Sequence, residues 1–152
     1  MCKTFSFFLL GVLSAVSGLR RGVISTPDAP AAIGPYSQAI TLHFASGETL
    51  VQAAGQIGLD PATGSLVGGG IKEETTRVME NIKAIMTAAG ATMDEIVECT
   101  VLMTDLGDYA ALNEIYADYF DEDNAPARAA FQVEKLPANA TAEIKCSAAI
   151  ES

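Results

Sequence analysis

The sequence predicts an α+β fold, a single domain in which one β-sheet is covered on one face by two α-helices. The chain has 152 residues, 49% of them hydrophobic, which is enough for one domain with its own core. Five short segments alternate apolar and polar residues as strands do, and two longer segments carry apolar residues at helical spacing. Apolar residues also remain on strand faces opposite the helices. A trimer packed sheet to sheet around an axis would cover them.

The first 22 residues have the layout of a targeting segment, which leaves residues 23–152 as the folded domain. Lys3 precedes an apolar run over residues 5–16, and no acidic residue occurs before Asp28. The run is too short to span a bilayer, which takes about 20 apolar residues. An N-glycosylation sequon at residues 139–141 lies beside Glu143, a candidate catalytic residue, and disfavours secretion. We therefore favour an organelle, mitochondrion or plastid. The alternative is a cytoplasmic protein with an extension of no function.

Residues 38–44 and 50–54 predict a β-hairpin closed by a turn at residues 45–48. Ile40, Leu42 and Phe44 share one face of the first strand, and we expect that face to be apolar and His43 to point from the other face into solvent. Residues 24–37 contain three prolines and a glycine, so we expect them to be irregular. Tyr36, at the end of this segment, either caps a pocket or fills the core.

Six glycines within residues 55–70 predict a backbone that passes close to another group, without the ending of a phosphate-binding loop. Residues 71–89 repeat apolar side chains at helical spacing, and Gly90 ends this helix. Residues 92–95 fit a capping box, and residues 96–104 alternate as a strand. We expect Val97 to share a face with Cys99.

Asp108 is placed to N-cap a second helix, whose apolar face runs from Leu112 to Phe120. Two further strands are expected over residues 129–133 and 142–150, joined by residues 134–141.

The composition excludes several kinds of site. The formal net charge of −10 disfavours nucleic acid as a partner, because phosphate binding depends on Lys and Arg. His43 is the only histidine, so neither a zinc ligand set nor a Ser-His-Asp triad is available, and we expect no metal or cofactor. Cys99 and Cys146 lie in strand-like runs without a C-x-x-C motif, and we expect both to be buried free thiols.

Arg128 is the residue that most suggests a binding site. Residues 23–152 hold six Lys or Arg against nineteen acids, and Arg128 follows a proline without an evident helical partner. Its planar guanidinium suits a small carboxylate ligand, although a structural ion pair is the alternative. Glu143 is the one carboxylate that enters the apolar run of the last strand.

Several blocks in this chain, in this order, resemble the Rid family of YjgF-like reactive intermediate deaminases. They are IGPYSQA at 33–39, GQIG at 55–58, TVLMTDLGDYAALNEIYADYF at 100–120, PARAAFQV at 126–133, LP at 136–137 and EI at 143–144. The resemblance implies a chorismate-mutase-like fold in a barrel-like homotrimer, with clefts between subunits that hydrolyse 2-imino or 2-enamino acids to 2-oxo acids and ammonia. This chain has Ala54 where the family often has serine.

The resemblance also assigns residues to the substrate site. It implies that Tyr36 lines the cleft, that Gly55, Gln56 and Ile57 present backbone groups to the ligand, and that Asn113 hydrogen-bonds near it.

For the reaction itself, we expect Arg128 to hold the substrate carboxylate and Glu143, with a pKa raised by desolvation, to act as general base. If the last two strands pair as a hairpin, these residues lie about four residues apart, or roughly 13 Å. We therefore expect them to meet across a subunit boundary. The alternatives are a non-catalytic protein that binds small carboxylates and, less favoured by the charge, an RNA-cleaving protein.

Overall fold

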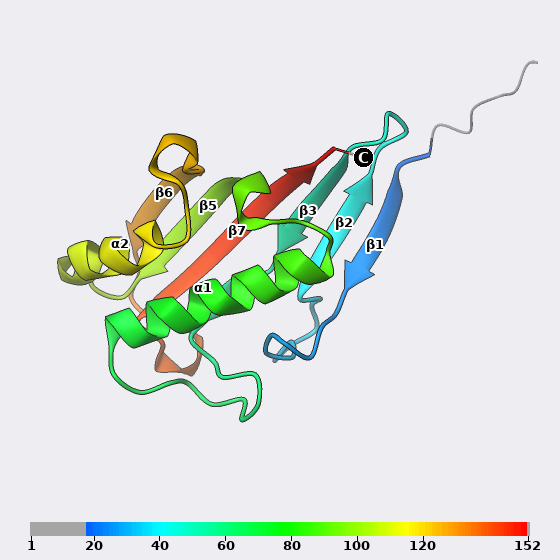
Figure 1. The fold of residues 1–152 in the computed structure, drawn as a ribbon. Helices are drawn as coiled ribbons and strands as arrows, with labels where there is room; N and C mark the ends of the chain where they lie inside the picture. Colours follow the sequence, from blue (N-terminus) through cyan, green and yellow to red (C-terminus); the bar gives the residue numbers. More distant parts are fainter. Residues whose placement is uncertain (1–17, 152) are drawn as a thin grey trace, which may run out of the picture.

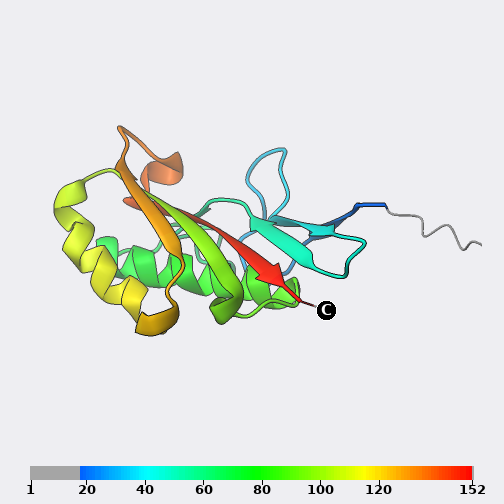
Figure 2. The same ribbon diagram turned by 90° about the horizontal axis from the view of Figure 1, so that it is seen from above.

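The computed structural model describes residues 18–151 and confirms the α+β architecture (Figure 1). Both helices lie on one side of a single sheet (Figure 2). The helices are α1 (Ile71–Ala88) and α2 (Tyr109–Ala117). The strands are β1 (Arg20–Ile24), β2 (Ala39–His43), β3 (Thr49–Ala53), β4 (Gln56–Ile57), β5 (Ile96–Met103), β6 (Ala127–Gln132) and β7 (Ala142–Ile150).

Residues 1–17 of the expected targeting segment lie outside the described part of the chain. Its residues 20–22 belong to β1, which pairs antiparallel with β2 at the edge of the sheet. No helix within residues 18–151 is long and apolar enough to cross a bilayer.

The sheet has the strand order β1-β2-β3-β7-β5-β6, and the short β4 also pairs with β7. The last two strands do not pair as a hairpin, because β5 lies between β6 and β7. The physical reason is that β5, α2 and β6 form a βαβ unit, in which a helix connects two neighbouring parallel strands. The parallel strand β6 therefore takes the edge, and β7 pairs with the other side of β5.

Helix α1 forms where the apolar period predicts it and provides much of the core. Its buried apolar side chains are Val78, Met79, Ile82, Ile85 and Met86. The helix is followed by Gly90, whose φ of 82° is a conformation that residues with a Cβ rarely adopt. The expected capping box is also present, since Glu95 Oε2 accepts hydrogen bonds from the backbone N–H and the hydroxyl of Thr92.

The faces of β2 are the reverse of what its apolar residues suggest. Ala39 and Thr41 are buried, whereas Leu42 is only partly buried and Phe44 is 45% exposed. Ala39 joins the core with small and branched residues of β3, so the helix-covered face at this edge admits small side chains. His43 is half-buried rather than solvated, because its two ring nitrogens lie 3.0 Å and 2.9 Å from threonine hydroxyls of β2 and β3.

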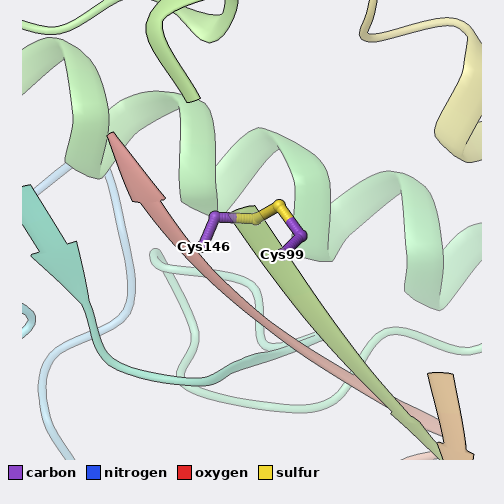
Figure 3. The surroundings of a disulfide bond; sticks show 2 residues. All are labelled: Cys99 and Cys146. Atoms are coloured by element: carbon purple, nitrogen blue, oxygen red, sulfur yellow. A yellow bond between two sulfur atoms is a disulfide. The ribbon is translucent and has the colours of Figure 1, made fainter. Parts of the chain in front are cut away.

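Two details of β5 also differ from expectation. A register shift between Ile96 and Glu98 turns Val97 away from the core, and Val97 is 49% exposed. Cys99 and Cys146 are not free thiols but form a disulfide (Figure 3). They lie directly opposite each other on β5 and β7, with Cα atoms 4.2 Å apart, and both point beneath α1.

The face of the sheet away from the helices keeps large apolar side chains in solvent. Val23, Val97 and Phe131 are each about half exposed there. The expected trimer would cover this face and stays a prediction.

Candidate functional site

Arg128 lies in an open pocket of about 740 Å³ between α2 and β6. Its guanidinium carbon lies 4.5 Å from the ring centroid of Tyr116 and 5.5 Å from that of Tyr109. Its Nη2 donates a hydrogen bond of 2.9 Å to the Tyr109 hydroxyl. Arg128 forms no salt bridge with any residue of the described chain, so the structural ion pair is not what holds it. The guanidinium is supported by rings and retains its charge for a ligand.

The helical repeat explains how α2 builds this pocket. Tyr109, Asn113 and Tyr116 are separated by four and three residues, which places them on one face of the helix. Arg128 and Ala130, two residues apart on β6, project toward the same pocket. Asn113 therefore lies within the same pocket as Arg128. No pattern in the sequence assigned Tyr109 or Tyr116 to this site.

The pocket changes the acidity of both tyrosines in opposite directions. A hydrogen bond from the Asn113 side chain and the nearby charge of Arg128 lower the pKa of Tyr109. Burial raises the pKa of Tyr116 to about 12. The Tyr116 hydroxyl and the Asn113 carbonyl oxygen are both buried without a hydrogen-bond partner.

Glu143 lies on the other face of the sheet, near the start of β7. Its register partners are Ile57 on β4 and Leu102 on β5, two apolar side chains that share its face. The resulting burial raises the pKa of Glu143, as a general base at neutral pH requires. Gly55 lies directly against the carboxylate, because a Cβ at this position would be 1.9 Å from Glu143 Oε1.

The loop that carries Gly55 is fixed by buried amides. The Gln56 side chain is 6% exposed and donates to the carbonyl oxygens of Ala54 and Gly55, so it binds its own loop. Asn81 of α1 is fully buried and donates to the carbonyl oxygens of Ile57 and Leu59. Asn81 was not expected from the sequence, although a polar residue within an apolar helical stripe was a detectable signal.

A buried carboxylate of α1 fixes the start of β7. Glu74 is 4% exposed, and its Oε2 accepts a hydrogen bond of 2.7 Å from the backbone N–H of Thr141. Gly58 allows this approach, since a Cβ there would be 3.0 Å from the Cα of Glu74. Glu74 thus places the backbone two residues before Glu143.

Tyr36 is 48% exposed and lines a small pocket together with Gly55, Gln56 and Ile57. Its hydroxyl accepts a hydrogen bond from the backbone N–H of Ile33. Tyr36 is therefore not a core residue, and it lies beside the Gly55 loop that contacts Glu143.

The sequence-predicted site residues thus form two clusters on opposite faces of one sheet. Arg128 is level with Cys99 on β5 and shares its helix-covered face, whereas Glu143 is level with Leu102 on the other face. Three residues along the strands and two strand spacings separate them, about 10 Å in each direction. One chain alone does not bring the two charges together.

Known proteins resemble this chain in sequence and in fold. A model of the Endoribonuclease L-PSP family matches residues 26–150. The human protein named 2-iminobutanoate/2-iminopropanoate deaminase is 45% identical over 133 residues, covering 88% of this chain and 93% of that protein. The Arabidopsis thaliana protein named Reactive Intermediate Deaminase A, chloroplastic, is 41% identical over 136 residues, covering 90% and 70%.

A solved structure is also similar to this chain in sequence and in fold. The crystal structure of RidA from an Antarctic Psychrobacter species is 42% identical, with a TM-score of 0.77 over 85% of this chain and 99% of that one. The chain therefore belongs to the Endoribonuclease L-PSP family, also called the YjgF or Rid family.

Proposed function

We propose that this protein hydrolyses reactive 2-imino and 2-enamino acids, such as 2-iminobutanoate and 2-iminopropanoate, to 2-oxo acids and ammonia. The observation that carries the proposal is the guanidinium of Arg128, which is open to a pocket and has no salt-bridge partner within residues 18–151. The names of the human and plant relatives support the same reaction.

In the proposed reaction Arg128 binds the substrate carboxylate and leaves the imine carbon accessible to water. Glu143 takes a proton from the attacking water as the C–O bond forms. Glu143 then gives this proton to the nitrogen, which makes a carbinolamine. The hydroxyl proton of the carbinolamine follows to the nitrogen, and the C–N bond breaks as the C=O bond of the 2-oxo acid forms, so that ammonia leaves. Acid–base assistance of this kind contributes about 10²–10⁴ in rate, and imines already hydrolyse readily in water.

The two charged residues would meet across subunits of a homotrimer. The arrangement within one chain supports this, because Arg128 and Glu143 point from opposite faces of the sheet. The half-exposed apolar side chains on the open face are a surface that such an assembly would bury. A fully active monomer would contradict the proposal.

The direct test generates 2-imino acids with an amino-acid oxidase and traps what survives with semicarbazide. We expect the wild type to reduce the trapped product, Arg128→Ala to lose both clearance and 2-oxo acid binding, and Glu143→Gln to lose clearance but keep binding. Glu134→Gln, which changes an exposed loop carboxylate, is the matched control. Clearance by Glu143→Gln at the wild-type rate would remove Glu143 as the base.

A second candidate is a non-catalytic protein that binds small carboxylates, since the Arg128 pocket is formed within one chain. Binding by the wild type without any imine clearance would favour it. RNA cleavage, which the family description suggests, is opposed by the net charge of −10. It requires RNA binding that weakens steeply with salt.

We also propose that residues 1–22 direct the protein to an organelle, as the plastid location in the name of the plant relative supports. Fusion of these residues to a fluorescent protein tests this, and a diffuse cytoplasmic signal would refute it.

A further inference from the structure

The hydroxyl of Tyr109 lies beside the guanidinium of Arg128. Tyr109 is the first residue of α2 and lines the Arg128 pocket. Its oxygen accepts a hydrogen bond of 2.9 Å from Arg128 Nη2, and Asn113, one helical turn away, lines the same pocket. The guanidinium therefore holds the phenol oxygen as an acceptor.

A phenol oxygen that accepts a hydrogen bond can still donate its own hydrogen. Tyr109 is 38% exposed, so this hydrogen is available to a molecule in the pocket. The only other phenol that lines the pocket is that of Tyr116, which is buried and has no partner within residues 18–151. The donor next to the guanidinium is thus the hydroxyl of Tyr109.

We propose that Tyr109 donates a hydrogen bond to the carboxylate that Arg128 binds, and that it is a specificity-determining residue for small 2-oxo and 2-imino acids. One carboxylate oxygen meets the guanidinium and the other meets the phenol. The inference rests on the proposed function for its substrate class and deepens the account of that same site.

The acidity of Tyr109 gives the interaction a pH dependence. The Asn113 hydrogen bond and the Arg128 charge lower the pKa of Tyr109, so its proton is lost earlier on raising the pH than that of an ordinary tyrosine. Once ionised, the phenolate repels a carboxylate and competes for the guanidinium. Ligand affinity should therefore fall on the alkaline side because of Tyr109.

The experiment measures the dissociation constant of 2-oxobutanoate, a stable product-like probe, by calorimetry from neutral to alkaline pH. We expect Tyr109→Phe to weaken binding about 10- to 100-fold at neutral pH and to abolish the alkaline loss of affinity. The matched control is Tyr119→Phe, which removes a hydroxyl that donates to Glu80 outside this pocket. This control should bind as the wild type does.

A kinetic measurement separates binding from chemistry. Because the carboxylate is present in both substrate and transition state, Tyr109→Phe should raise KM for 2-iminopropanoate and leave kcat nearly unchanged. If Tyr109 had only a structural role, the Tyr109→Phe variant would still lose affinity for 2-oxobutanoate at alkaline pH.

The outcomes are distinguishable from failure of the proposed function. Wild-type affinity with an unchanged alkaline loss in Tyr109→Phe overturns this inference even if the enzyme clears imines. Conversely, a wild type that clears no imine but binds 2-oxobutanoate in a Tyr109-dependent way refutes the enzyme and supports the inference. A wild type that binds no 2-oxobutanoate overturns the inference.

Discussion

Replacing Gly55 by alanine should displace the proposed general base without unfolding the protein. The added Cβ would lie 1.9 Å from Glu143 Oε1, whereas ordinary van der Waals contact begins at 3.4 Å. The carboxylate oxygen must therefore move by about 1.5 Å, the difference between these two distances. The group that moves is the end of a flexible side chain, so the backbone of β7 can stay in place.

The size of the effect follows from this displacement. A misplacement of about 1 Å in a catalytic group can cost about 10²-fold in rate, and loss of the base costs at most about 10⁴-fold. We expect kcat/KM for 2-iminopropanoate to fall about 10²-fold in Gly55→Ala. Binding of 2-oxobutanoate, which depends on Arg128, should be retained.

The assay is the clearance of oxidase-generated imine, with thermal unfolding measured alongside. Gly68→Ala is the control, since a Cβ there meets nothing within 4 Å and the backbone conformation is ordinary. The double variant Gly55→Ala, Glu143→Gln should be no slower than Glu143→Gln alone, because both act on one group. Wild-type clearance by Gly55→Ala would refute the placement of the base beside this glycine.

Three further predictions concern pH, the disulfide and the chain start. Since the pKa of Glu143 is raised, kcat/KM should begin to fall on acidification at a higher pH than it would with a carboxyl of ordinary pKa. The folded state favours the neutral carboxyl and loses stability as the pH rises through the raised pKa. Glu143→Gln should therefore unfold at a higher temperature than the wild type at neutral pH. A chain with alanine at Cys99 and Cys146 should lose about 4 kcal/mol of unfolding free energy in chemical denaturation, as expected for a cross-link between residues 47 apart; equal stability of the oxidised wild type and this variant would contradict the disulfide. A chain that begins at Val23 should melt at a lower temperature than one that begins at Leu19, because it lacks three of the five residues of β1; identical melting would show that β1 contributes nothing.

Elements with strong local signals were predictable from the sequence. Helix α1 followed from its apolar period, its end from Gly90, and the turn after it from the Thr92 and Glu95 capping box. Each of these depends on residues within a few positions of one another. Strand β1 was missed because Arg20 and Arg21 fitted the end of a targeting segment equally well.

Features that depend on distant partners were not predictable. Alternation in β2 showed two faces but not which one the helices cover, and the core took the face of Ala39 rather than that of Leu42. The Cys99–Cys146 pair required the register of β5 against β7, which no single strand reveals.

The candidate site was predictable in part for the same reason. Arg128 stood out as a cation in an acidic chain, and the family blocks indicated Glu143, Asn113 and Tyr36. Tyr109 and Asn81 were missed, because an aromatic or amide in a helix takes a site role only through its three-dimensional neighbours.

Strand β5 is the common reference for both halves of the proposed active site. Cys99 of β5 is the register partner of Arg128 on β6, and Leu102 of β5 is the register partner of Glu143 on β7. The disulfide also links β7 to β5 covalently. An insertion or deletion of one residue between positions 99 and 102 would send one charged group to the wrong side of the sheet. This short interval of β5 therefore cannot change length during evolution without separating the two charged groups from their faces.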